Sequence, residues 1–128
     1  MDLTRIKFIK ESNLQDLRDN NYLENLIIKL GFINYMNNNY FDLIFIDGDH
    51  SYNGVKNDYE ISKNSGKIFV FHDIVNDVCA GVVQFWNELK NNENDTYNFL
   101  EFTEQYEDVW NDTQQKFLGI GVAIKKNI

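Results

Sequence analysis

The chain has 128 residues, the length of one ordinary domain rather than two. Twenty acidic residues against twelve basic ones give a net charge of −8, so nucleic acids and anionic membrane surfaces are expected to repel it. No apolar run reaches the roughly 18–20 residues of a membrane span. The only cysteine, Cys79, cannot form an internal disulfide. We expect it to be a small buried apolar residue in a reducing, cytoplasmic compartment.

The first half of the chain alternates between strand and helix patterns. Residues 6–9 form a short β-type run. Apolar residues then recur at spacings of three and four between Leu23 and Ile33, which predicts an amphipathic helix that ends near Gly31. Phe41–Ile46 is apolar in its last four residues. Such a run is typical of a central parallel strand, because both of its faces are covered.

The second half continues this alternation. Ser51 predicts the N-cap of a helix that ends at Asn64–Gly66, and Ile68–Phe71 is the next apolar strand. A third helix and two final strands complete the order, at Ala80–Lys90, Asn98–Thr103 and Phe117–Ile124. Strands that alternate with helices predict an α/β fold with a parallel sheet and crossover helices. We expect residues 6–9 to pair directly, in parallel, with Leu43–Ile46, which gives a five-stranded sheet.

Polar residues follow both central strands abruptly, and they include both histidines of the chain. Asp47-Gly48-Asp49-His50 follows the first strand and His72-Asp73 follows the second. Neighbouring parallel strands end at the same edge of a sheet, so Asp47 and Asp73 are expected to lie close together. Two carboxylates can hold a hard divalent cation, and a nearby histidine can act as a general base. Asp and His after strands are also common turn and cap residues, which is the competing interpretation.

The segment Phe41–Tyr52, with Asp-Gly-Asp-His-Ser-Tyr at its end, resembles the fourth-strand motif of class I S-adenosylmethionine (SAM) methyltransferases. Within that family it resembles the metal-dependent small-molecule O-methyltransferases, which include macrolide-sugar and caffeoyl-CoA-type enzymes. Gly66–Asp73 resembles the fifth strand and Leu118–Val122 the last one. The resemblance covers residues 6–125 in order. It implies a Rossmann-like, mostly parallel sheet that ends in an antiparallel hairpin strand, in a single domain.

The family's first two strands, with the glycine-rich turn that holds SAM, have no counterpart in this sequence. The only Gly-x-Gly is Gly119-Ile120-Gly121, in an apolar segment where glycines of a closely packed strand are expected. The resemblance therefore implies a truncated methyltransferase-like domain over residues 1–128 that binds SAM weakly. It leaves open whether an N-terminal portion is missing or a second copy of the chain is the partner.

The resemblance also implies roles for individual residues. Asp47 matches the family's first metal carboxylate, and His72 and Asp73 match the pair that supplies the other protein ligands, with Mg²⁺ as the expected ion. His50 matches the catalytic base of the sugar-modifying members.

Two further residues are implied to contact the cofactor. Asp49 matches a position beside the amino-acid end of SAM, and it can equally cap the turn that follows the strand. Glu11 lies where the family places an acid at the edge of the adenine.

The function implied is the metal-binding, catalytic half of a SAM-dependent O-methyltransferase that acts on a hydroxyl of a small molecule or sugar. One alternative is a non-catalytic remnant that works by association. The other is a metal-dependent phosphoesterase, although such sites need more than the two histidines available here.

Overall fold

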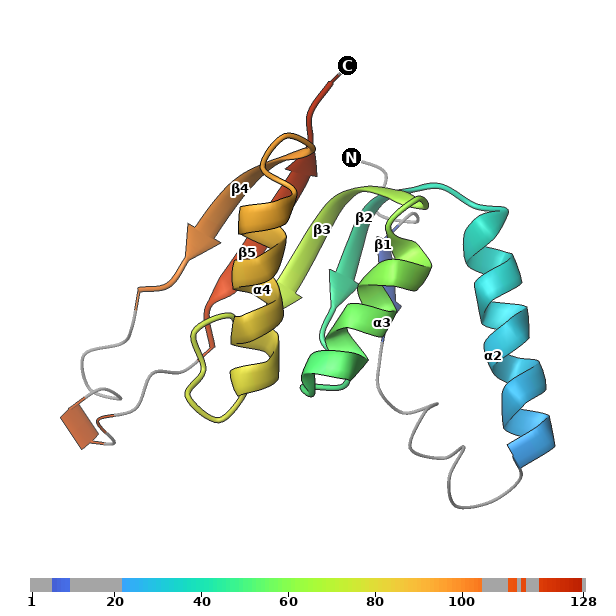
Figure 1. Ribbon diagram of the computed structural model, residues 1–128, viewed down its shortest axis with the longest axis horizontal. Helices are drawn as coiled ribbons and strands as arrows, with labels where there is room; N and C mark the ends of the chain where they lie inside the picture. Colours follow the sequence, from blue (N-terminus) through green and yellow to red (C-terminus); the bar gives the residue numbers. More distant parts are fainter. Residues whose placement is uncertain (1–5, 10–21, 105–110, 113, 115–117, 128) are drawn as a thin grey trace.

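The computed structural model describes residues 6–9, 22–104, 111–112, 114 and 118–127 (Figure 1). The strands are β1 (Ile6–Ile9), β2 (Phe41–Ile46), β3 (Gly66–His72), β4 (Tyr97–Phe102) and β5 (Ile120–Lys125). The longer helices are α2 (Tyr22–Asn37), α3 (Tyr52–Ser62) and α4 (Ala80–Asn92). The predicted alternation of strands and helices is confirmed. No helix of the described part of the chain is long and apolar enough to cross a membrane.

The five strands form one mixed sheet in the order β1-β2-β3-β5-β4. β1, β2 and β3 are parallel, whereas β5 is antiparallel to both β3 and β4. Ile6 lies opposite Leu43 and Ile9 opposite Ile46, which confirms the predicted direct pairing of residues 6–9 with β2. The chain therefore steps across the sheet from β1 to β3 in one direction. Successive right-handed crossovers in one direction place their helices on the same face.

The second of these crossover helices, α3, and the next helix, α4, lie side by side on one face, and the core lies between them and the sheet (Figure 1). Its centre is aromatic: Trp86 packs on Phe71 and Phe99, with ring centroids 5.4 and 5.5 Å apart. A Cβ on Gly121 would lie 2.5 Å from the Trp86 ring, so this strand position admits only glycine without a shift. This confirms the expectation of a closely packed glycine in the last strand. Tyr59 and Tyr97 add a buried hydroxyl pair at 2.9 Å.

The helix predicted to end near Gly31 continues to Asn37, which corrects the sequence-based boundary. A glycine inside a helix, such as Gly31, lowers the stability of the helix by only about 1 kcal/mol relative to alanine. Met36, which is fully buried, holds the last turn against the core. The true end is marked by asparagines, because the Asn38 and Asn39 amides donate to the carbonyls of Asn34 and Tyr35, four residues earlier in each case.

The last two strands are also shifted from their predicted bounds. The final strand was expected from Phe117, which lies outside the described residues, and it begins at Ile120. Leu118 and Gly119 have φ values of 57° and 80°, which no extended strand accommodates. The strand before it covers Tyr97–Phe102 rather than Asn98–Thr103, because the buried Tyr97 already pairs with Lys125.

A polar contact ties the edge strand β4 to α4. The Glu101 carboxylate accepts hydrogen bonds from the Lys90 ammonium and from the Trp86 indole N–H, the latter at 2.7 Å. Both hydrogen bonds lower the pKa of Glu101, and the one from Lys90 has the larger effect.

We predict that Glu101→Gln lowers the free energy of unfolding at neutral pH by less than about 1 kcal/mol, since a partly exposed pair is screened by water. Because the pKa of Glu101 is lower in the folded protein than in the unfolded chain, this stabilisation is fully present above the ordinary glutamate pKa. It is lost as the pH falls through the lowered pKa of the folded state. Urea unfolding from neutral pH to about pH 3 checks it. The exposed Glu104→Gln is the control, and a Glu101 effect that is constant with pH would contradict the prediction.

Candidate active site at the carboxyl ends of β2 and β3

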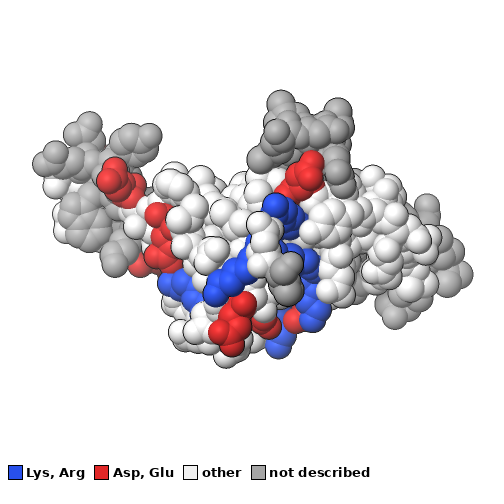
Figure 2. All heavy atoms as spheres, turned by 90° about the horizontal axis from the view of Figure 1, so that it is seen from above, with Lys and Arg blue, Asp and Glu red and all other residues white. Residues whose placement is uncertain are grey.

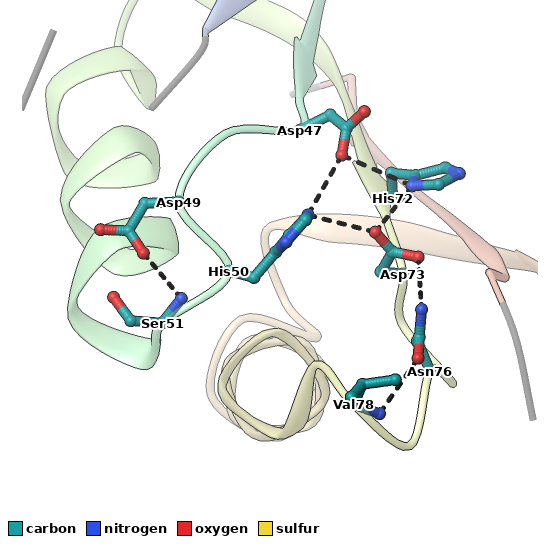
Figure 3. A network of polar contacts seen from close by, with 8 residues as sticks. All are labelled: Asp47, Asp49, His50, Ser51, His72, Asp73, Asn76 and Val78. Atoms are coloured by element: carbon teal, nitrogen blue, oxygen red, sulfur yellow. Dashed lines mark hydrogen bonds and ion pairs between the residues drawn. The ribbon is translucent and has the colours of Figure 1, made fainter. Parts of the chain in front are cut away.

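The polar residues predicted to meet do so at the carboxyl ends of the two central strands (Figure 3). Ile46 lies opposite Phe71 in the parallel register, so the next residues along each strand, Asp47 and His72, emerge side by side. Asp73 follows, and His50 comes from the turn between β2 and α3. The predicted proximity of Asp47 and Asp73 is confirmed.

Two imidazoles and two carboxylates alternate around a small ring of contacts. The Nε2 atom of His50 lies 3.5 Å from Oδ1 of Asp47 and 3.2 Å from Oδ2 of Asp73. The Nδ1 atom of His72 lies 3.4 Å and 2.9 Å from the same two oxygens. An ionised carboxylate can only accept hydrogen bonds. Each imidazole therefore donates from the nitrogen that faces the two carboxylates, Nε2 in His50 and Nδ1 in His72. In the neutral rings the lone pairs are then left on Nδ1 of His50 and Nε2 of His72.

Asp73 is the most firmly held member of this ring. Its side chain is 7% exposed, and its φ of 68° lies in the left-handed region that Asp tolerates better than most residues. Its backbone N–H donates to the Gly119 carbonyl at 2.9 Å, and its Oδ1 accepts from the Asn76 amide at 3.0 Å. A buried carboxylate needs such hydrogen-bond partners to offset its loss of hydration. The strand end, the turn after it and the residue before β5 thus fix one carboxylate in place.

The turn that carries His50 is built on local hydrogen bonds. Asp49 accepts from the backbone N–H of Ser51 at 2.8 Å, and its side chain points away from the ring of contacts (Figure 3). The Ser51 hydroxyl accepts from the Gly54 N–H at 3.0 Å and so forms the predicted N-cap of α3. The structure thus shows the turn-capping contact of Asp49, and its role beside a cofactor stays a prediction. Glu11 lies outside the described residues.

Cys79 also belongs to this site, which the sequence analysis missed. It occupies the N-cap position of α4 without a side-chain capping bond, and it is buried as predicted. Burial, followed by the negative charges of Asp73 and Asp47, raises the pKa of its thiol. The only sequence signal was its position between the second polar cluster and a helix.

Gly81 explains how α4 comes so near. A Cβ at this position would lie 2.3 Å from the Tyr52 backbone nitrogen and 2.8 Å from the His50 carbonyl oxygen. The first turn of α4 therefore rests directly on the backbone that carries His50.

Two sets of side chains offer ligand atoms that lie within 4.8 Å of one another. One is Asp47, His72 and Asp73, the set predicted to hold a metal, and the other is His50, Asp73 and Cys79. The two sets share Asp73 and differ in chemistry. The first provides two oxygens and a nitrogen, whereas the second provides one nitrogen, one oxygen and one sulfur.

An open groove of about 530 Å³ begins one residue after Asp73. It lies between the segment Ile74–Asp77, the outer side of α4 and Glu101 of β4, with apolar and polar side chains in its wall. A groove of this size accommodates a small organic molecule.

Lysines gather at the opposite end of the molecule. Because β5 runs antiparallel to β3, its last residue, Lys125, lies beside the beginning of β3 and donates to the Lys63 carbonyl. Figure 2, which views the molecule from that end, shows lysine side chains grouped there among a few acidic ones. The candidate site thus lies away from these lysines, and within it the histidines are the groups that face the two carboxylates.

Comparison with known proteins supports the fold. No protein-family model matches the chain, and no curated protein does. Among solved structures, it is similar to the O-methyltransferase from Bacillus cereus in complex with SAH, with a TM-score of 0.53 and 14% sequence identity. The similarity covers 94% of this chain and 62% of that one. The chain therefore shares a Rossmann-like α/β fold with this neighbour, and it spans less than two thirds of the neighbour's length.

We predict that Gly81→Ala destabilises the protein by about 1–3 kcal/mol, because the added methyl group meets backbone that cannot yield. Urea unfolding measures this change. Gly31→Ala is the matched control: nothing lies within 4 Å of its Cβ, so it should stabilise α2 by up to about 1 kcal/mol. Equal stability changes in the two variants would contradict the close approach of α4.

Proposed function

We propose that this chain supplies the acceptor-activating part of an O-methyltransferase, which moves the methyl group of SAM to a hydroxyl of a small molecule or sugar. The observation that carries the proposal is the ring of Asp47, His50, His72 and Asp73 at the carboxyl edge of the sheet. In open α/β sheets this edge is where ligands bind. The similar fold of an O-methyltransferase in complex with SAH supports it, since SAH is SAM without its transferable methyl group.

His50 is the group that removes the proton of the acceptor. In methyl transfer the hydroxyl oxygen attacks the methyl carbon, the carbon–sulfur bond breaks and the hydroxyl proton must leave. The His50 side chain is 47% exposed, and its Nδ1 carries the lone pair that takes this proton. Asp73 orients the ring through Nε2 and stabilises the imidazolium that forms, as the acid of a catalytic triad does.

The residues present fit a divalent cation beside this base. Asp47 and Asp73 offer carboxylate oxygens and His72 an imidazole nitrogen, a set that suits Mg²⁺ and extends the choice to Mn²⁺. When bound, such an ion would lower the pKa of an acceptor hydroxyl and orient it.

The described residues contain no Gly-x-Gly turn between a strand and the helix after it, the kind of turn that usually approaches a nucleoside. Gly119 packs against Val75 and Gly121 against Trp86, so neither is available for that purpose. Residues 10–21, between β1 and α2, include no glycine in the sequence. We therefore expect weak binding of SAM to this chain, and assays need SAM at saturating concentration. This same feature favours the alternative of a non-catalytic remnant that works by association.

We predict that His50→Gln lowers methyl transfer by about 10²–10⁴-fold, because the acceptor proton then has no base. The measurement is transfer of labelled methyl from SAM to a panel of phenols and monosaccharides. Glu104→Gln is the control for an exposed charge. Undiminished transfer by the variant would overturn the role of His50. A folded wild type that methylates nothing in the panel would favour the non-catalytic alternative.

We predict that Mg²⁺ or Ca²⁺ binds weakly at the ring and that Asp47→Ala abolishes binding, since one of two carboxylates is lost. Titration calorimetry measures this. Asp95→Ala, which removes an exposed acid elsewhere, should leave binding unchanged. Equal affinity in the wild type and Asp47→Ala would rule out the ring as the cation site.

A further inference from the structure

The second ligand set differs from anything predicted from the sequence. Nitrogen of His50, oxygen of Asp73 and sulfur of Cys79 all lie within 4.8 Å of one another. They come from three separate places in the fold: the turn before α3, the end of β3 and the first turn of α4. Their convergence therefore depends on tertiary packing and not on a local sequence motif.

The chemistry of this set selects the ion. Mg²⁺ and Ca²⁺ take oxygen ligands, whereas thiolate and imidazole suit zinc and its neighbours in the first transition row. Zinc lies about 2.0–2.3 Å from its ligands, so two ligands of one ion are about 3–4 Å apart. Small side-chain rotations bring the three atoms within that range. Three protein ligands with one open position are typical of zinc sites that bind a further molecule.

The surroundings hold two of the three ligands in place and leave a route for the ion. Asp73 and Cys79 are buried, and Asp73 is fixed by Asn76 and by its backbone. Gly81 lets the first turn of α4 rest on the His50 backbone, which brings Cys79 to the ring. His50, with nearly half of its side chain exposed, forms the outer wall through which an ion enters.

We propose that His50, Asp73 and Cys79 form a binding site for a zinc-class ion, with a fourth position open to water. The Cys79 thiol releases its proton to solvent, and the proton of His50 moves from Nε2 to Nδ1, so that Nε2 of a neutral imidazole binds the ion. Because both sets need Asp73, this ion and one held by Asp47 and His72 exclude each other. The site itself does not depend on the proposed methyl transfer, and its test is a binding measurement.

Cobalt is the probe, because a thiolate ligand gives Co²⁺ a charge-transfer absorption in the near ultraviolet. Cys79 is the only cysteine in the sequence, so such a band has one possible source. We expect wild type to bind one Co²⁺ with this band and Zn²⁺ to displace it. Cys79→Ser should lose the band. His50→Gln should weaken binding by at least about 10-fold, because losing even a hydrogen-bond partner of a metal ligand costs about 10–100-fold in affinity. Equimolar Mg²⁺, which we expect the ring to bind only weakly, should leave the band unchanged.

Two controls separate this site from its neighbour. His72→Gln removes an imidazole of the other ligand set and should keep the band, whereas Asp77→Asn removes an exposed carboxylate near Cys79 and should change nothing. Circular dichroism verifies that each variant is folded. If Cys79→Ser does not fold, alkylation of the wild-type thiol by iodoacetamide replaces it: one equivalent of Zn²⁺ should slow the reaction and Mg²⁺ should not.

Three results would overturn the proposal. They are the absence of a charge-transfer band in wild type, a band that His72→Gln abolishes while His50→Gln leaves it intact, and displacement of the band by equimolar Mg²⁺. None of these results bears on methyl transfer, because the assay contains neither SAM nor an acceptor. Loss of methyl transfer with an intact band would conversely leave the ion site standing.

Discussion

Parallel pairing of β2 with β3, in the register that sets Ile46 opposite Phe71, decides where the polar groups of the site lie. Both strands end at the same edge, so Asp47 and His72 emerge together and Asp73 follows one residue later. A shift of one residue in this register would turn every side chain of one strand to the other face. The buried Ile44 and Phe71 and the half-buried Phe45 resist such a shift, because their faces are set by packing.

Charge compensation is the second constraint on the site. Two carboxylates that approach the same point repel each other, and water does not screen the buried Asp73 well. Both histidines of the chain are placed between them, each with one nitrogen toward both carboxylates. A proton on either ring, or a cation in its place, relieves the same repulsion. The arrangement therefore suits proton transfer and metal binding alike, which is why both proposals arise from one cluster.

The sheet and the ring were predictable from the sequence because local pattern determines them. Apolar runs marked β2 and β3, and the abrupt polar residues after them marked the edge at which they end. Boundaries were less predictable where side chains or special backbone angles act. The buried Met36 holds α2 against the core beyond Gly31, the amides of Asn38 and Asn39 cap its end, and the left-handed Leu118 delays the start of β5.

Cys79 could not be assigned to the site from its sequence position, because what brings it there is packing between elements. Residues 74–78, which separate it from Asp73, must turn back, and the first turn of α4 must touch the loop before α3. The second condition depends on Gly81, whose missing Cβ is a tertiary requirement without a local signature. Where a ligand set depends on such a contact, the sequence contains the ligand residues but does not predict that they lie close together.

Asp73 connects the two proposed roles of the site. It is the only ligand that both sets contain, and its left-handed backbone, its bond to Asn76 and its contact with Gly119 leave it no freedom to serve them in turn. Which of the two ligand sets binds an ion therefore depends on the ligands that they do not share. An ion held with Asp47 and His72 leaves the His50 lone pair free to accept a proton, and the imidazole can work beside it. An ion held with Cys79 takes His50 as a ligand and removes it from proton transfer. The kind of ion bound thus determines whether the proposed base is available. A hard ion such as Mg²⁺ leaves His50 free to accept a proton, and a thiol-seeking ion such as Zn²⁺ does not.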